Sequence, residues 1–232
     1  MTSDVVVSCL LDDAAIEDVY GGDEGLIGAA RPGQVFVEHA TFSPALARDI
    51  ERQLSKHDAA FLDAPVSGGP EGAAAGNLTV MVGGNSEALA AVDDLLRAYA
   101  GRIVHVGTPG SGLELKLVNQ LLVSCHAAAA AEAAELMKRM NIRYDVAAPV
   151  LNASWASSAM LSRMFDRRLA AAHAPSEATV AGLATPQRLV QELLAAHEWV
   201  PAVSKAALAV FANARSEGRG GQDLTELLEA TP

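Results

Sequence analysis

The chain has 232 residues, of which 50% are hydrophobic and 19% charged, and its formal net charge is -11. This composition predicts a globular protein of one or two domains, and the negative charge argues against a nucleic-acid partner. Cys9 and Cys125 lack the spacing of a disulfide framework or a zinc site, so we expect no metal and a reducing cytoplasm. No signal peptide is indicated, and polar residues interrupt the longest apolar tract, residues 121–137, so no membrane span is expected.

The first half of the chain alternates short β-branched runs with helical stretches, a pattern typical of βαβ units around a parallel sheet. The first run, residues 5–11, is apolar on both faces, which predicts a central strand covered by helices. Because nothing upstream in this sequence pairs with one of its edges, we expect either missing neighbouring strands or cover from another chain. Strands are expected at residues 5–11, 34–38, 60–63, 78–82 and 103–106, and helices at residues 14–30, 43–57 and 86–98.

The second half is rich in alanine with a helical periodicity, and β-branched runs disappear after residues 107–110. We therefore place a domain boundary between residues 109 and 110 and predict an all-helical second domain, entered through one long helix. Residues 171–186 combine alanine, proline and small polar residues, which predicts a loop. The helices are expected at residues 113–140, 146–152, 160–171, 187–197, 203–216 and 224–229.

A glycine-rich segment, Asp63-Ala64-Pro65-Val66-Ser67-Gly68-Gly69, follows the third predicted strand. Ligands of open α/β sheets bind beyond the carboxyl ends of the strands. Ser67 offers a hydroxyl there, and Gly68 and Gly69 let backbone N–H groups approach an anion without interference from a side chain. The segment suits a small carboxylate, and on spacing alone a glycine-rich turn without a ligand explains it equally well.

A second polar group of residues stands at the start of the long predicted helix. Gly110-Ser111-Gly112 leads into Lys116, Asn119 and Gln120, and positions i, i+3 and i+4 share one helix face. A lysine whose pKa is lowered by burial can act as general acid and base, while an amide orients the substrate. The alternative, an ordinary solvated helix face, stays open on these residues alone.

Both segments resemble motifs of the β-hydroxyacid dehydrogenases, the family of 3-hydroxyisobutyrate dehydrogenase and tartronate semialdehyde reductase. Residues 63–84 are similar to its substrate-binding signature. Residues 110–120 resemble its catalytic helix start, a glycine pair followed by Lys-x-x-Asn-(Asn/Gln). The order and spacing match, and a weaker similarity covers nearly the whole chain. The resemblance implies a Rossmann-type α/β parallel sheet, N-terminally truncated here, in residues 1–109, and an all-helical dehydrogenase domain in residues 110–232.

The resemblance also implies site residues and a reaction. Lys116 is the implied catalytic acid and base, and Asn119 or Gln120 positions the substrate hydroxyl. The implied reaction is reversible hydride transfer between NAD or NADP and a small 3-hydroxy acid. The residues implied to hold the substrate carboxylate are Ser67, Gly68 and Gly69, and those implied to line the nicotinamide are Leu10, Leu11 and Thr41.

Three features depart from the family pattern. No G-x-G-x-x-G turn for the cofactor pyrophosphate precedes Val5, a difference of about two βα units. A Lys-Asp pair of the family's helical domain falls at Ala184-Thr185, and Leu11 and Ala40 replace its usual proline and serine. We therefore expect these 232 residues to bind NAD or NADP weakly or not at all.

The leading hypothesis is an NAD(P)-dependent 3-hydroxyacid dehydrogenase that acts on a small carboxylate. Two alternatives remain: a non-catalytic relative kept as a binding or interaction module, or a fragment of a longer enzyme. We also expect a homo-oligomer, because the alanine-rich helices have long faces that one small domain cannot bury.

Overall fold

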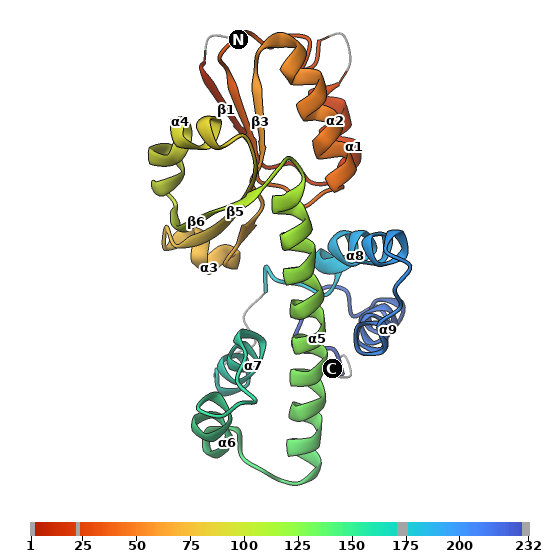
Figure 1. Cartoon of the computed structure of the whole chain (residues 1–232). Coiled ribbons are helices and arrows are strands. Elements are labelled where there is room, and N and C mark those ends of the chain that lie inside the picture. The colour runs from red at the N-terminus through yellow and green to blue at the C-terminus, as the bar shows by residue number, and fades with distance from the viewer. Residues whose placement is uncertain (1–2, 22–23, 171–175, 229–232) are drawn as a thin grey trace. The chain divides into compact units, whose positions relative to one another are not determined.

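The computed structural model describes residues 3–21, 24–170 and 176–228 of the chain (Figure 1). The chain forms two compact units, an α/β unit of residues 1–118 and a helical unit of residues 119–232. The domain boundary after residue 109 stays a prediction, because the long helix begins in one unit and ends in the other. In the described part of the chain, no helix is both long and apolar enough to cross a membrane.

A six-stranded mixed sheet forms the centre of the α/β unit, with the strand order β1-β2-β3-β5-β4 and with β6 paired to β5. β1, β2 and β3 are parallel, as are β5 and β6, while β5 runs antiparallel to β3 and β4. The strands are β1 (Val5–Ser8), β2 (Val35–Glu38), β3 (Ala60–Asp63), β4 (Val66–Ser67), β5 (Leu78–Gly84) and β6 (Ala100–Gly107).

The expected parallel sheet is confirmed in the β1–β2, β2–β3 and β5–β6 pairs, and the β3–β5 pair adds an antiparallel junction that the sequence does not indicate. Only the short strand β4 and the six-residue helix α3 (Gly69–Ala74) lie between β3 and β5, and such a helix is too short to carry the chain back along the sheet. Strand β1 pairs with β2, and no other described strand pairs with its second edge.

Alternating side chains of the strands bury both faces of this sheet. Phe36 and Phe61 point into one apolar cluster, together with residues of α1 (Asp13–Tyr20) and α2 (Pro44–Leu54). Val37 and Leu62 point into a second cluster, which α4 (Ser86–Arg97) covers. Helices therefore cover β2 and β3 on both sides of the sheet, whereas Val7 of β1, in the run expected to be a covered central strand, is 43% exposed.

One predicted helix in this unit is shorter than expected, and another is nearly as long as expected. The helix expected through Ala30 ends at Tyr20, where the N–H of Gly21 bonds to the carbonyl of Glu17 and the chain turns away. Ser43 precedes α2, but its side chain makes no capping hydrogen bond. A short 3-10 helix, Ser55–His57, completes the stretch expected to be helical after α2.

The helical unit is built along α5 (Ser111–Arg139), whose alanines pack on two sides. Ala127 and Ala131 contact a cluster that contains Phe211, and Ala130 and Ala134 contact one that contains Phe165. The remaining helices are α6 (Tyr144–Asn152), α7 (Ala159–Leu169), the 3-10 helix Ala181–Leu183, α8 (Ala184–Ala196) and α9 (Ala202–Ser216).

Two predictions in this unit also need correction. The expected loop at residues 171–186 is helical from Ala181 onward, and residues 171–175 lie outside the described part. The helix expected at residues 224–229 is a series of turns over residues 224–228, and Glu229 lies outside the described part. The backbone N–H groups here make other hydrogen bonds than those of a helix. The N–H of Leu224 donates to the carbonyl of Ala178, and the N–H of Thr225 donates to the Asp223 side chain.

Candidate active site

A buried carboxylate at the end of β3 fixes the start of α5. The side chain of Asp63 is fully buried, and its Oδ1 and Oδ2 accept hydrogen bonds from the backbone N–H groups of Gly110, at 2.7 Å, and Leu113, at 3.0 Å. Burial raises the pKa of Asp63 to about 6, although these backbone hydrogen bonds act in the opposite direction. The strand and the helix are thus joined immediately ahead of Lys116.

Lys116 is the buried basic group that this junction positions. Only 7% of its surface is exposed, and it makes no ion pair or hydrogen bond with any residue that the structure describes. Burial lowers the pKa of Lys116 to about 8, because an ammonium ion loses its hydration in an apolar environment. A lysine of this kind exchanges a proton near neutral pH, as a general acid and base must.

The residues expected to hold a carboxylate lie at the turn between β4 and α3. Ser67 ends β4, where it pairs with Thr79 of β5, and its side chain is partly exposed. Gly68 has φ of 136°, and a Cβ atom there would lie 3.1 Å from the side chain of Leu78. Glycine is therefore required both by the backbone conformation and by the close approach of β5.

The two expected amides follow Lys116 on the same continuous helix. Asn119 donates its Nδ2 hydrogen to Oε1 of Gln120 at 3.1 Å, and Gln120 is buried. Helical spacing places Lys116, Asn119 and Gln120 on one side of α5. The Ser124 hydroxyl donates a hydrogen bond to the backbone carbonyl of Gln120 at 2.9 Å, one turn further along the helix.

The three residues expected near a nicotinamide lie beyond the carboxyl ends of β1 and β2, on the same edge of the parallel strands. Leu10 and Thr41 are partly buried, and Leu11 is 83% exposed. An apolar side chain this exposed at the ligand-binding edge of a sheet offers a surface to the flat ring of a cofactor.

Glu38 at the end of β2 connects these two loops by hydrogen bonds, a role that the sequence pattern does not indicate. Its side chain is fully buried. It accepts hydrogen bonds from the Ser8 hydroxyl at 2.5 Å, from the Leu10 N–H at 3.1 Å and from the Ala40 N–H at 2.8 Å. The only sequence signal was an acidic residue directly after an apolar run, which is weak by itself.

Side chains of the protein accept hydrogen bonds at the N-termini of three described helices of the α/β unit. Asp12 accepts a bond from Ala15 at the start of α1, and Asn85 accepts from two N–H groups of α4. Asp63 occupies the start of α5 in the same way, and Pro44 leaves the first position of α2 without an N–H. The N-termini of α1, α4 and α5 therefore leave fewer unoccupied N–H groups for a phosphate.

Two family descriptions cover the chain from end to end. Residues 1–107 match the NAD binding domain of 6-phosphogluconate dehydrogenase. Residues 110–231 match a domain described as NAD-binding of NADP-dependent 3-hydroxyisobutyrate dehydrogenase.

Individual relatives match over most of the chain. An L-threonate dehydrogenase from Cupriavidus necator is 33% identical over 99% of this chain and 77% of its own length. A NAD-dependent L-serine dehydrogenase from Pseudomonas aeruginosa is 38% identical over 66% of this chain and 51% of its own length. A crystal structure of 3-hydroxyisobutyrate dehydrogenase from Salmonella typhimurium has a TM-score of 0.86 and 29% identity, covering 97% of this chain and 79% of that one. The chain thus spans between half and four fifths of these proteins.

Proposed function

Because this chain belongs to the β-hydroxyacid dehydrogenase family, we propose that it catalyses the reversible oxidation of a small 3-hydroxy acid with NAD or NADP. The family is one of NAD(P)-dependent oxidoreductases. The observation that carries the proposal is Lys116, buried without a counter-ion and with a pKa lowered to about 8. Such a group suits proton transfer, whereas a non-catalytic binding module has no need to bury an unpaired lysine.

In the proposed reaction, neutral Lys116 accepts the proton of the substrate hydroxyl while the C–H bond of the same carbon breaks. NAD or NADP, when bound, takes up the hydride from that carbon. The backbone N–H groups near Gly68 and Gly69 and the Ser67 hydroxyl hold the carboxylate. Asn119 or Gln120 orients the hydroxyl toward Lys116. In the reverse direction the charged Lys116 returns the proton.

The substrate class follows from what these groups can bind. Serine and 3-hydroxyisobutyrate, after which relatives are named, each carry a hydroxyl on the carbon β to a carboxylate. In the proposed site the turn at Gly68 binds a carboxylate and Lys116 accepts a proton from a hydroxyl. The substrate must therefore carry a carboxylate and, on the β carbon, a hydroxyl. We therefore propose a small unbranched or singly branched 3-hydroxy acid.

The proposal is tested with Lys116→Ala, assayed with L-serine, L-threonate and 3-hydroxyisobutyrate at millimolar NAD or NADP. Loss of a general acid and base lowers turnover about a hundredfold or more. The control is Lys56→Ala, which removes an exposed lysine of the same unit and should leave turnover unchanged. Near-normal turnover of Lys116→Ala, or no turnover by the unaltered protein with any of these acids, would reject the proposal.

For the cofactor, we propose that Leu10, Leu11 and Thr41 contact the nicotinamide end and that binding by the 232 residues alone is weak. Side chains of the protein already accept hydrogen bonds at the N-termini of α1, α4 and α5, which limits the contacts available to a phosphate. The net charge of -11 adds repulsion, which salt screens in part. Calorimetric titration with NAD⁺ and NADP⁺ tests this, and a micromolar Kd would contradict it.

We further propose that the protein is a homo-oligomer, with the cytoplasm as its compartment. Large apolar side chains of the helical unit remain exposed, among them Val146, Val150 and Trp155 around α6 and Val200 and Val203 before and in α9. Apolar surface on this scale is typical of a face that a second subunit covers. A monomer in light scattering at micromolar concentration would contradict the oligomer.

A further inference from the structure

His39, the residue that follows β2, is a buried histidine with a partner on each ring nitrogen. Only 8% of its surface is exposed. Its Nδ1 lies 2.6 Å from the backbone carbonyl oxygen of Ala64, and its Nε2 lies 2.7 Å from the hydroxyl oxygen of Tyr99. The ring of Tyr99 also packs edge-on against the imidazole, with 5.5 Å between the ring centroids. Contacts on two sides therefore fix the position of the imidazole.

The chemistry of these two partners decides which ring nitrogen carries the proton. A carbonyl oxygen only accepts hydrogen bonds, so Nδ1 of His39 donates to Ala64. In a neutral ring Nε2 then accepts from the Tyr99 hydroxyl. Burial lowers the pKa of His39, although the hydrogen bond to Ala64 and the charge of Glu38 act in the opposite direction. The ring is therefore neutral at pH 7 and presents a fixed donor to the Ala64 carbonyl.

Ala64 begins the segment that leads from β3 to the proposed carboxylate turn at Gly68. It is fully buried, and its N–H donates to the backbone carbonyl of Glu38 at 2.8 Å. The end of β2 thus holds Ala64 by two hydrogen bonds, one from the backbone and one from the His39 side chain. Asp63, the preceding residue, is held separately because β3 pairs with both β2 and β5. Loss of the imidazole therefore acts on the segment after β3 and not on the start of α5.

The backbone of His39 belongs to the other proposed binding loop. Its N–H donates to the Ser8 carbonyl at 2.9 Å, which continues the pairing of β2 with β1. Ala40 and Thr41 follow, and Thr41 is one of the residues proposed to contact the nicotinamide. The Glu38 side chain holds this loop through the N–H of Ala40. His39 therefore joins the cofactor loop to the substrate segment, and its imidazole is the part that reaches the substrate side.

We propose that His39 is a positioning residue that places the carboxylate turn through the Ala64 carbonyl. This role rests on the proposed function, because the carboxylate turn is part of that proposal. Without the imidazole donor, a buried carbonyl loses this partner, and the segment after β3 shifts to recover one. A shifted turn binds the substrate carboxylate less well, whereas the cofactor loop keeps its place because Glu38 holds it.

Two substitutions of His39 separate the roles of its ring nitrogens. The amide nitrogen of Asn is as far from Cβ as Nδ1 is, so His39→Asn keeps a donor for the Ala64 carbonyl. The longer side chain of His39→Gln reaches the position of Nε2 and keeps a partner for Tyr99 instead. We expect His39→Gln to raise the KM for the hydroxy acid about tenfold, the effect of losing one hydrogen bond at a buried carbonyl. His39→Asn should stay within about twofold of the unaltered protein, and neither variant should change how the rate depends on cofactor concentration.

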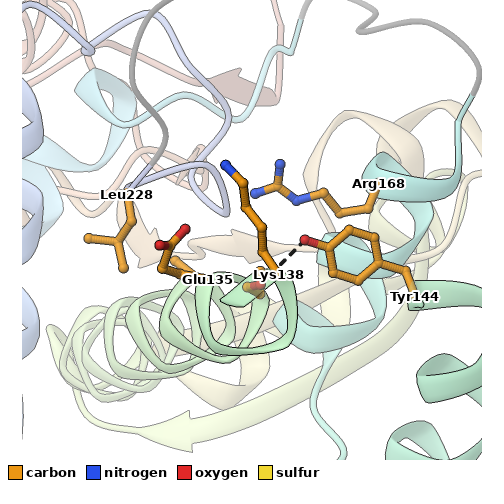
Figure 2. A pocket seen from close by; sticks show the side chains of 7 residues that line it. Glu135, Lys138, Tyr144, Arg168 and Leu228 are labelled. Carbon is orange, nitrogen blue, oxygen red and sulfur yellow. Dashed lines mark hydrogen bonds between the residues drawn. The ribbon is translucent and has the colours of Figure 1, made fainter. Parts of the chain in front are cut away.

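The control is Tyr144→Phe in the helical unit. It removes another hydrogen bond from a side chain to a backbone carbonyl, the 3.3 Å bond from the Tyr144 hydroxyl to Ala134 (Figure 2), and it should leave the KM unchanged. A loss of folded protein lowers the apparent turnover number without changing the KM, so it cannot imitate the expected result. An unchanged KM in His39→Gln, or an equal increase in His39→Asn, would overturn this role.

A second measurement needs no turnover. Long-range nitrogen–proton correlation spectra of the unaltered protein should show His39 with its proton on Nδ1, and a proton on Nε2 alone would contradict the proposal. The amide chemical shifts of Ser67, Gly68 and Gly69 should move more in His39→Gln than in His39→Asn, and not in Tyr144→Phe. If the protein turns over none of the acids, these spectra still test His39. If turnover is normal and both the KM and the spectra ignore His39, the positioning role fails while the proposed function stands.

Discussion

Among the residues that the structure describes, each unit buries one aspartate completely, and the two carboxylates have opposite pKa shifts. Asp63 in the α/β unit accepts hydrogen bonds only from neutral backbone N–H groups, and burial raises its pKa to about 6. Burial raises the pKa of Asp223 in the helical unit too, yet hydrogen bonds from Arg163, Ser176 and Thr225 outweigh it and hold the pKa below its usual value. Neutral donors do not replace lost hydration fully, whereas a guanidinium group does.

Other buried groups show the same difference between the two units. It separates groups that can exchange protons from charged groups that hold the structure together. Burial lowers the pKa of Lys116 to about 8 and also lowers that of His39, so burial favours the neutral forms of these two groups of the α/β unit. Asp223 instead bridges Arg163 at 2.7 Å and Arg167 at 3.7 Å. Groups that titrate near neutral pH can move protons, and a fully paired carboxylate holds segments together.

The largest expected effect comes from removing the paired carboxylate. Asp223→Ala leaves the partly buried Arg163 and Arg167 without this partner and frees the N–H of Thr225. Loss of one member of such a network costs about 3 kcal/mol. Hydrogen exchange should show this loss in peptides of the helical unit, with those of the α/β unit unchanged. Asp166→Ala, on the exposed side of α7, is the control, and equal losses in both units would contradict the assignment.

The second largest expected effect is that the stability of the two units depends on pH with opposite signs. The folded-state pKa of Asp63, about 6, lies above the usual value of 3.8 for an aspartate, so the folded α/β unit binds more protons and loses stability as pH rises from about 4 to about 6. The loss is at most about 3 kcal/mol. The lowered pKa of Asp223 works in reverse, because its contribution is present above about pH 4 and is lost as pH falls further.

Hydrogen exchange of both units between about pH 2.5 and about pH 6.5, corrected for intrinsic rates, measures this difference. Asp63→Asn cannot ionise, so its α/β unit should no longer lose stability as pH rises over this range, while the helical unit keeps its own pH dependence. An unchanged slope in Asp63→Asn would show that another group in the α/β unit titrates in this range.

Local sequence patterns predicted most strands, the long helix and the placement of the two motifs. Strands β2 and β3 are predicted from short β-branched runs between helical stretches, and α5 from its long helical periodicity. What failed depends on partners distant in sequence. The antiparallel β5, the role of Asp63 at the start of α5, and the turns at residues 224–228 are fixed by contacts that no local window contains.

The pH dependence of turnover set by Lys116 tests whether the α/β unit is the reactive one. With a pKa of about 8, Lys116 is mostly charged at pH 7 and mostly neutral at pH 9. Oxidation of the hydroxy acid needs the neutral amine as proton acceptor, so turnover at saturating substrate should rise about tenfold between these values. Reduction of the carbonyl product needs the charged form and should fall over the same interval. Because a change in protein stability would move both directions together, opposite slopes with a common midpoint identify the lysine, and parallel slopes would show that another group controls the rate.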